Sequence, residues 1–401
     1  MASITSPAQR TLEFGIYRDG DNNLDESQGL TLRQALQTST KDRRIEYTVQ
    51  DTTSAGTGRL RTDSFTIADG GVGEASIEAP HDMASERNLA SFVAHVLDNA
   101  EKSGAKQTWI ELTDHGAGDG GGLEADSAHA IMAMPQIAQA IADGVKLHAQ
   151  EHPEDADRNV DGVVANQCLM ASLGFADELS HAGVKYLAAS PETMVSPGVP
   201  SNVADAIAKH KQPEDMAHAV VSDVMREKYG AEGQTWGPAA AFDVLDLDPA
   251  KMQNVERSVK ALNDAIVSRK ENHADIAAIR EDARSVEGMV RFPEATPDMP
   301  WHADRPAIAL YNTIADDVRL DTGLRAAART AANDIGSIVV AHKESRSFEP
   351  FHGSDYRDSV GPTVHFPVNA QQIDPWAPHV TETHNRFFVA TDAAAAERVI
   401  A

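Results

Sequence analysis

Short apolar runs alternate with amphipathic helical patterns through the first 250 residues of the chain. The predicted strands lie at 12–17, 45–49, 60–67, 108–112, 162–165 and 184–189, and predicted helices lie at 90–100, about 130–150 and 173–180. The strand at 60–67 is expected to form a hairpin with the Gly-rich segment at 70–73, because glycine allows tight turns. Strands that alternate with helices in this order are typical of a mostly parallel sheet with helices on both faces. The sequence therefore predicts an α/β fold.

The pattern changes after Asp248. Residues 250–345 are Ala-rich, charged and helical in pattern, and Asp-Pro and Asp-Thr-Gly at 248 and 321 are typical of helix N-termini. Strand character returns at 362–367, and the chain is predicted to finish on an Ala-rich helix. We therefore expect a core domain at 1–250 and a mainly helical C-terminal region at 251–401, with a late strand at about 361–367.

Composition and charge exclude several classes of function. The 401 residues include 35 Lys and Arg against 61 Asp and Glu, which gives a formal net charge of −26. Such a chain repels phosphate backbones and anionic lipid surfaces, so we expect neither nucleic acid nor a membrane as a partner. No apolar run is long enough to span a bilayer, and the N-terminus has no apolar signal segment. The expected location is the cytoplasm, or outside the cell after export without a visible cleavable signal; the oligomeric state is not predicted.

A histidine and the lone cysteine each follow the end of a predicted strand. Cys168 is the only cysteine, so no intramolecular disulfide can form, and His115 precedes it by 53 residues. Carboxyl ends of parallel strands meet at one edge of a sheet, where ligands bind. An imidazole beside a thiol is the minimum for nucleophilic acyl transfer. We expect the helix after Cys168 to lower the thiol pKa, and the N–H groups of Gly116 and Cys168 to form an oxyanion hole.

Two other patterns could bind a metal ion. His148 and His152 fit the H-x-x-E-H arrangement of inverted zinc peptidases, whose spacing places both histidines on one helix face. Proline follows His152 directly and no third ligand is evident, so we interpret them as a helix-end pair and predict no metal. The loop 19–25 carries acidic and amide side chains at alternate positions but lacks the glycine and glutamate of an EF-hand. Calcium is thus possible in chemical terms but is not predicted, and no cofactor is expected.

Several blocks together resemble the clostripain-type (family C11) cysteine peptidases, which have a caspase-like fold. In chain order they are DGDNNL at 19–24, WIELTDHG at 109–116, NQCLMAS at 166–172, YLAASPET at 186–193, VLDLDPAKM at 244–252 and GPTVHFP at 361–367. The resemblance implies a caspase-like α/β/α sandwich, with His115 as general base and acid and Cys168 as nucleophile. It also implies a thiol protease, a hydrolase that cleaves peptide or protein substrates, often after Arg or Lys. Members are often matured by cleavage between histidine and cysteine, where this chain has an exposed loop near Lys146 and Arg158.

The sequence departs from the family pattern at one position. Asn166 stands two residues before the cysteine, where the family usually has an acid that binds the basic P1 side chain. A neutral amide gives up that charge attraction, so the preference for Arg or Lys does not follow, and we expect Asn166 and Glu192 to line the P1 pocket. Two alternatives to the peptidase stay open: a caspase-like binding module with an altered pocket, and a zinc metallopeptidase that uses His148 and His152.

Overall fold

The computed structural model describes residues 10–54, 59–194, 198–200, 202–209, 212–217, 220–221, 241–269, 273–282, 304–344 and 360–366. Its centre is a ten-stranded sheet in the order β13-β11-β10-β9-β6-β1-β2-β3-β4, with β5 also paired to β3. Its strands are β1 (Leu12–Asp19), β2 (Ile45–Thr53), β3 (Arg61–Ala68), β4 (Gly71–Val72), β5 (Ser76–Glu78), β6 (Gln107–Thr113), β9 (Gly162–Asn166), β10 (Tyr186–Ala189), β11 (Ala241–Asp246) and β13 (Val339–Glu344). The five central strands, β10 to β2, are parallel, and the strands outside them are antiparallel.

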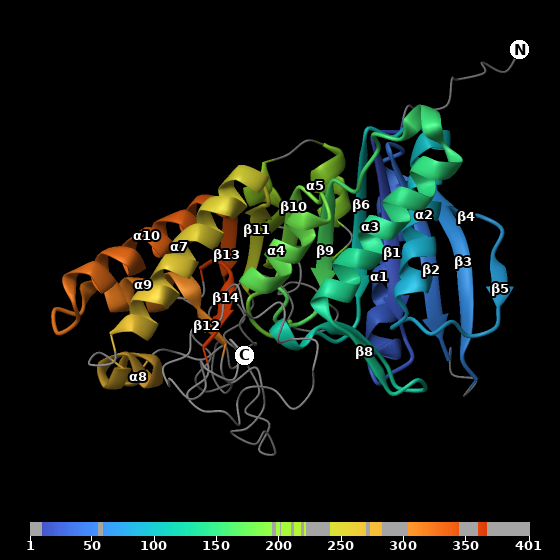
Figure 1. Cartoon of the computed structure of the whole chain (residues 1–401). Coiled ribbons are helices and arrows are strands. Elements are labelled where there is room, and N and C mark those ends of the chain that lie inside the picture. Colours follow the sequence, from blue (N-terminus) through green and yellow to red (C-terminus); the bar gives the residue numbers. More distant parts are fainter. Residues whose placement is uncertain are drawn as a thin grey trace, which may run out of the picture.

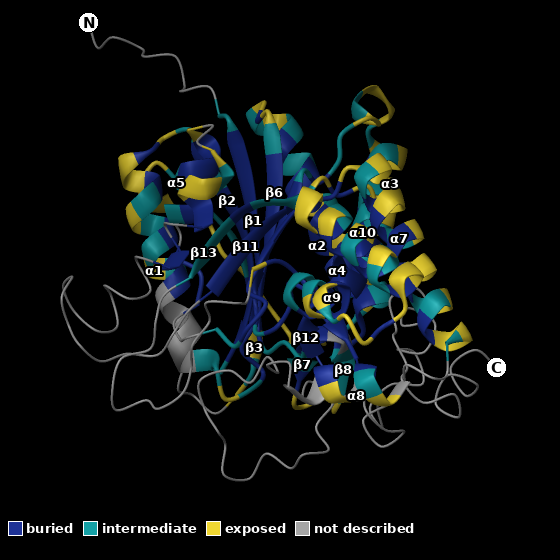
Figure 2. Cartoon of the chain, turned by 90° about the vertical axis from the view of Figure 1, so that its left-hand side faces the viewer, coloured by how far each residue is buried: buried dark blue, intermediate teal, exposed yellow. Residues whose placement is uncertain are grey.

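Helices cover both faces of the sheet, as Figures 1 and 2 show. One face packs against α1 (Asp25–Lys41) and α5 (Asn202–Ala208). The other packs against α2 (Glu86–Ser103), α3 (Met134–Glu151), α4 (Leu173–His181), α7 (Pro249–Ser268), α9 (Ala307–Asp316) and α10 (Thr322–Ile338). The short α8 (His273–Asp282) contacts α9. This α/β/α sandwich around a largely parallel sheet confirms the predicted fold class.

Two short two-stranded sheets lie outside the central one. One pairs β7 (Gly122–Ala125) with β8 (Ala130–Met132), and the other pairs β12 (Asp304–Pro306) with β14 (Thr363–His365). Two single-turn 3₁₀ helices, η1 (Gly118–Gly120) and η2 (Pro153–Asp155), sit in the connections. The loop after His115 therefore leads through η1 into β7.

The alternation of side chains along β1 explains how both cores form. Leu12, Phe14 and Ile16 belong to the core under α1 and α5, while Tyr17 belongs to the core on the opposite face. Gly15 faces α2, where a Cβ would lie 2.7 Å from Val96 Cγ2. Because glycine has no side chain, α2 approaches the sheet closely at this point.

Most predicted elements are present. The six predicted strands are present as β1, β2, β3, β6, β9 and β10. The helix ended by Gly104, the hairpin of β3 with β4, and both Asp N-caps are also confirmed. Other features differ. Helix α1 occupies residues 25–41, for which we predicted no element, and β8 occupies the first residues of the helix predicted at about 130–150. Strands β12 and β13 lie within the segment predicted as helical. The division near residue 250 stays a prediction, and β13 pairs with β11 across it. The predicted Ala-rich helix at the end of the chain lies outside the described residues.

None of the described helices combines the length and apolar character needed to cross a membrane.

Candidate active site

His115 and Cys168 follow two strands that are direct neighbours. β6 and β9 run parallel, with Thr113 opposite Asn166 at their carboxyl ends. Each candidate residue comes two positions beyond its strand, so both reach the same edge of the sheet. The tight loops after these strands bring the backbones together.

Gly116 is the point of contact between the two loops. A Cβ at this position would collide with the Cys168 carbonyl oxygen and would lie 2.9 Å from Gln167 Cβ. The Gln167 side chain also donates a hydrogen bond from Nε2 to the His115 carbonyl oxygen, at 2.8 Å. Only a glycine allows this approach, which fixes the histidine loop against the cysteine loop.

The His115 imidazole has a partner that the sequence analysis did not identify. Its Nε2 lies 2.7 Å from Asn23 Oδ1, and Asn23 belongs to the turn that follows β1 at this edge. Because an amide oxygen only accepts, Nε2 carries the proton and Nδ1 carries the lone pair. Burial lowers the pKa of His115, and the charges of Glu124 and Asp126 oppose that effect. The imidazole is thus held in its neutral form, in the tautomer with a free base at Nδ1.

Asp114 fixes the turn that carries Asn23. Its carboxylate accepts a 2.5 Å hydrogen bond from Asn22 Nδ2 and another from the Glu124 backbone N–H. Asn22 also donates to the Glu124 carbonyl oxygen at 3.1 Å. Burial raises the pKa of Asp114 well above its usual value, and the neighbouring charge of Asp19 raises it further. The buried Asp114 therefore ties the Asn22 turn to the loops around His115.

Cys168 has the environment of a resting thiol. The residue is half-buried, and its Sγ accepts a hydrogen bond from the Met194 backbone N–H at 3.3 Å. Burial raises the thiol pKa, although the Met194 hydrogen bond acts to lower it. This corrects our expectation of a pKa lowered by the following helix: α4 begins only at Leu173, and a helix dipole acts within about one turn. Within the described residues, the His115 side chain makes no hydrogen bond to Sγ.

The backbone around Cys168 is strained. Leu169, the next residue, has φ of 64°, in the left-handed region that side chains other than glycine rarely adopt. Its N–H donates to the Glu192 carbonyl oxygen at 3.0 Å, which holds this conformation. Backbone strain like that of Leu169 is common at functional sites.

In the part of the chain that the structure describes, the N–H groups of Gly116 and Cys168 meet no hydrogen-bond acceptor.

Both residues expected in the P1 pocket are buried at this edge. Asn166 Nδ2 donates to Glu111 Oε1 at 2.9 Å, and Asn166 Oδ1 accepts from the Val199 N–H at 2.8 Å. Glu192 is fully buried just beyond β10. Glu111 is a second residue that the sequence analysis missed: burial raises its pKa to about 7, although hydrogen bonds from Asn166 and Thr113 oppose the shift. Its position within the WIELTDHG block is the only signal in the sequence.

The two candidate metal patterns have different outcomes. In the loop 19–25 the acidic side chains bond to separate partners: Asp19 accepts from the Asp21 N–H, Asp21 bonds Ser127, and Asp25 bonds Arg18. They do not converge on one point. His148 and His152, by contrast, lie together at the end of α3. Nearby, Arg158 Nη1 donates a hydrogen bond to the Ala105 carbonyl oxygen, just before β6 begins. That is the amino edge of the sheet, opposite His115 and Cys168.

Comparisons with known proteins identify the fold. No family model matches the sequence, and no curated protein matches it. Solved structures do match. One is a secreted C11 cysteine protease from Bacteroides thetaiotaomicron in complex with an irreversible peptide inhibitor. It is 13% identical, its TM-score is 0.63, and the match covers 94% of this chain and 99% of that chain. An inactive zymogen C11 protease from Parabacteroides distasonis is 13% identical with a TM-score of 0.61, covering 96% and 99%. The chain therefore has the fold of the C11 proteases.

Proposed function

We propose that the chain is a cysteine endopeptidase of the C11 type, with Cys168 as nucleophile and His115 as general base and acid. The observation that carries the proposal is the contact between their loops through Gly116, at the carboxyl edge of a sheet with the C11 fold. The similar protein from Bacteroides thetaiotaomicron binds a peptide inhibitor, which supports a peptide or protein as substrate. The chemistry of this pair requires no cofactor.

In the proposed reaction, His115 Nδ1 takes the proton of Cys168, and the thiolate attacks the scissile carbonyl carbon. The Gly116 and Cys168 N–H groups donate to the oxyanion that forms. The imidazolium then protonates the leaving amine, which completes the acyl-enzyme. Water, deprotonated by the same imidazole, hydrolyses the thioester and restores the thiol.

The described conformation corresponds to a resting state of this mechanism. The thiol has a raised pKa, and the imidazole is held by Asn23 on the side away from Nδ1. For the reaction, the Cys168 thiol must leave the Met194 N–H and turn toward His115. We propose that substrate binding, or cleavage of the chain between His115 and Cys168 near Arg158, favours that rearrangement. Lys146, which we expected in an exposed loop, lies within helix α3.

We propose that Asn166 and Glu192 line the P1 pocket. The carboxyl group of Glu111 lies behind the Asn166 amide, and its pKa of about 7 leaves it partly ionised at neutral pH. Glu111 would therefore supply only part of the charge that the usual acid at position 166 provides. A preference for Arg or Lys would then depend on Glu192 and Glu111. A P1-scanning peptide library tests this: Glu192→Gln should lower kcat/KM for Arg and Lys substrates more than for neutral ones.

The function itself is tested with Cys168→Ala. We expect this variant to lose hydrolysis of a fluorogenic peptide library, and the unaltered chain to be labelled at Cys168 by an acyloxymethyl ketone. Hydrolysis that is undiminished in Cys168→Ala would overturn the proposal. Hydrolysis that is retained in Cys168→Ala and abolished by a chelator would favour the zinc-peptidase alternative with His148 and His152.

One observation favours the non-catalytic binding module. The thiol pKa is raised, whereas nucleophilic cysteines usually have a lowered one. Iodoacetamide kinetics separate the two functions: a module predicts alkylation no faster than that of an ordinary thiol at the same pH, and a peptidase predicts acceleration once a peptide substrate analogue is present.

A further inference from the structure

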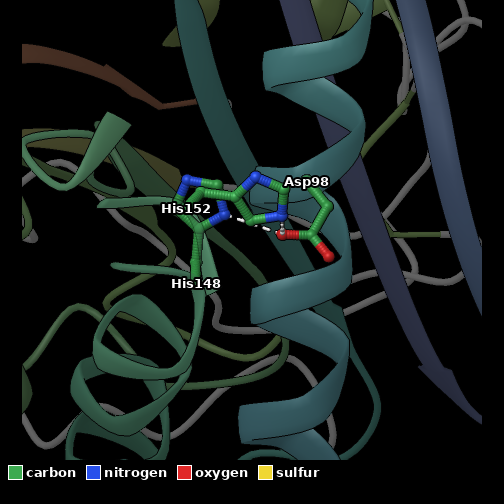
Figure 3. A group of neighbouring side chains, drawn as sticks. All are labelled: Asp98, His148 and His152. Carbon is green, nitrogen blue, oxygen red and sulfur yellow. Dashed lines mark hydrogen bonds and ion pairs between the residues drawn. The ribbon is translucent and has the colours of Figure 1, made fainter. Parts of the chain in front are cut away.

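We propose that Asp98, His148 and His152 form a binding site for a divalent transition-metal ion of the zinc class, separate from the candidate active site. Asp98 lies on α2, and the two histidines lie one helical turn apart near the end of α3. One ligand atom from each residue lies within 4.8 Å of the others. Figure 3 shows the two imidazole rings side by side, facing the Asp98 carboxylate.

The distances suit a tetrahedral ion. His152 Nε2 lies 3.4 Å from Asp98 Oδ1, which is about the separation of two ligands around zinc at roughly 2.0–2.2 Å from each. His148 Nδ1 lies 2.7 Å from the same oxygen, at hydrogen-bond distance, so the ion would enter by replacing that hydrogen bond. Two imidazoles and one carboxylate form a donor set that zinc prefers, and water would complete the tetrahedron.

Each histidine also has a second carboxylate on its other side. His152 Nδ1 lies 2.6 Å from Glu101 Oε2, so in the neutral ring this nitrogen carries the proton and Nε2 presents its lone pair toward Asp98. His148 Nε2 is fully buried, makes no hydrogen bond within the described residues, and lies 3.5 Å from Asp155 Oδ2. When Nδ1 binds the ion, the proton moves to Nε2 and faces Asp155. A carboxylate behind each ligating histidine is the usual second layer of a zinc site.

Charge and burial support the same conclusion. Asp98, Glu101, Glu154 and Asp155 all lie near the two rings, and Arg158 pairs with Asp155. Negative charge is therefore in excess, and a divalent cation would offset it. His148 is buried, while Asp98 and His152 are 18% and 25% exposed, which leaves a path for the ion.

The site would act as a clamp between elements. Asp98 and His148 are fifty residues apart in the chain, and the ion would join the ends of α2 and α3 at the amino edge of the sheet. Glu151, which supplies the general base in the H-x-x-E-H pattern of zinc peptidases, is exposed. We therefore assign the ion a structural role.

The test is metal binding by the full chain carrying Cys168→Ala, which removes the only thiol. After treatment with a chelator, the protein is dialysed against micromolar Zn²⁺ and analysed for bound metal, and its Tm is measured with and without Zn²⁺. We expect one equivalent per chain and a Tm raised by several degrees. Co²⁺ should give the visible absorption of a tetrahedral site.

Two variants and two controls assign the site. Asp98→Asn and His152→Gln keep the size of the side chains and should lose the bound ion, the Tm shift and the cobalt spectrum, with an unchanged circular dichroism spectrum. His81→Gln, at an exposed ion pair, should change nothing. His181→Gln disrupts a separate candidate cluster, Asp177, His181 and Glu256, and should also retain binding. No bound zinc, or binding lost in His181→Gln and kept in Asp98→Asn, would overturn the proposal.

Discussion

At the scale of single residues, the candidate site depends on two hydrogen bonds that hold the reactive groups apart. Asn23 fixes the imidazole of His115, and the Met194 N–H holds the thiol of Cys168. Both bonds come from loops at the carboxyl edge of the sheet. Asn23 is a positioning residue, because it acts on the substrate only through the histidine.

Replacement of Asn23 should reduce turnover. In Asn23→Ala the imidazole loses the partner that selects its tautomer, so we expect kcat to fall by roughly 10-fold, with KM little changed. Asn23→Asp keeps an acceptor oxygen and should restore most of the rate. Its negative charge should also raise the pKa of His115 and move the acidic limb of the kcat/KM profile to higher pH. Equal losses in both variants, with no movement of the profile, would contradict this role.

A methyl group at Gly116 should separate the loops that carry His115 and Cys168. The added Cβ of Gly116→Ala would meet the backbone of Cys168, so the loops must move apart. We expect kcat/KM to fall by about 100-fold, because displacements near 1 Å already cost that much. Gly120→Ala in the same loop meets only Ala117 Cβ, at 3.2 Å, and should keep most of the activity. Steady-state kinetics of both variants distinguish a specific contact from general damage to the loop.

At the scale of elements, glycines decide how closely helices can pack. Gly144 in α3 faces α2, and a Cβ there would lie 2.6 Å from the Ala90 carbonyl oxygen and from Val93 Cβ. Gly336 in α10 has no atom within 4 Å of the corresponding position. The two helical glycines therefore allow the same substitution to be compared at a crowded position and at an open one.

Alanine should change the free energy of unfolding in opposite directions at these two positions. Alanine favours a helix over glycine by about 1 kcal/mol, so Gly336→Ala should raise the free energy of unfolding by up to about that amount. In Gly144→Ala the contact between α2 and α3 must open, and we expect a net loss of about 1–3 kcal/mol. Urea unfolding of both variants measures the difference. A gain in stability for Gly144→Ala would show that the helices can shift freely.

Pattern and spacing predicted the elements better than they predicted their contacts. The strands next to His115 and Cys168 were evident because apolar β-type runs end at these residues, and parallel pairing then placed both at one edge. Helix α1 was missed because its sequence is largely polar, and 25–41 is stabilised as a helix by packing of residues such as Ala35 on the sheet. Strand β13 was missed because its partner β11 lies almost a hundred residues earlier.

The missing parts of the site have the same cause. Asn23 and Glu111 reach His115 and Asn166 only through tertiary contacts, which no local pattern encodes. The raised thiol pKa of Cys168 also depends on burial by segments distant in the chain, whereas the expected helix effect was a local argument. Local rules therefore selected the candidate residues, and the fold determines their electrostatics.

At the scale of the whole molecule, buried carboxyl groups link stability to pH. Burial raises the pKa of six of them among the described residues: Glu13, Asp19, Asp51, Glu111, Asp114 and Asp243. The pKa of Asp51 rises to about 6, and those of Asp19 and Glu111 rise to about 7. The pKa of His342 is also raised, because its hydrogen bonds to Asp243 and Glu344 outweigh the opposing effect of burial. Each carboxyl group therefore binds a proton more readily in the folded chain than in the unfolded one, and the hydrogen-bonded Asp243 and His342 contribute as one pair.

The sign of the pH dependence follows from this difference. Between the unfolded carboxyl pKa values near 4 and the folded values of about 6–7, the native state binds more protons, so the free energy of unfolding falls as pH rises. Carboxylates with a lowered pKa make the free energy of unfolding rise with pH, but only at low pH. One example is Asp69, whose pKa is lowered to about 2 by its hydrogen bonds from Arg43 and Arg10. The net charge of −26 adds self-repulsion as pH rises. We therefore expect maximum stability near pH 5 rather than at neutral pH.

Urea unfolding of the Cys168→Ala chain at pH 5, 6, 7 and 8 tests this expectation, since that variant cannot cleave itself. The midpoint should fall steadily from pH 5 to 8. Glu111→Gln should flatten the slope, because a shift from 4.5 to about 7 corresponds to roughly 3 kcal/mol, and the new amide oxygen can still accept from Asn166. Glu78→Gln, on the exposed strand β5, should leave the slope unchanged. Stability that rises toward pH 8 would mean that these carboxyl groups ionise without cost in the folded chain, with water reaching them.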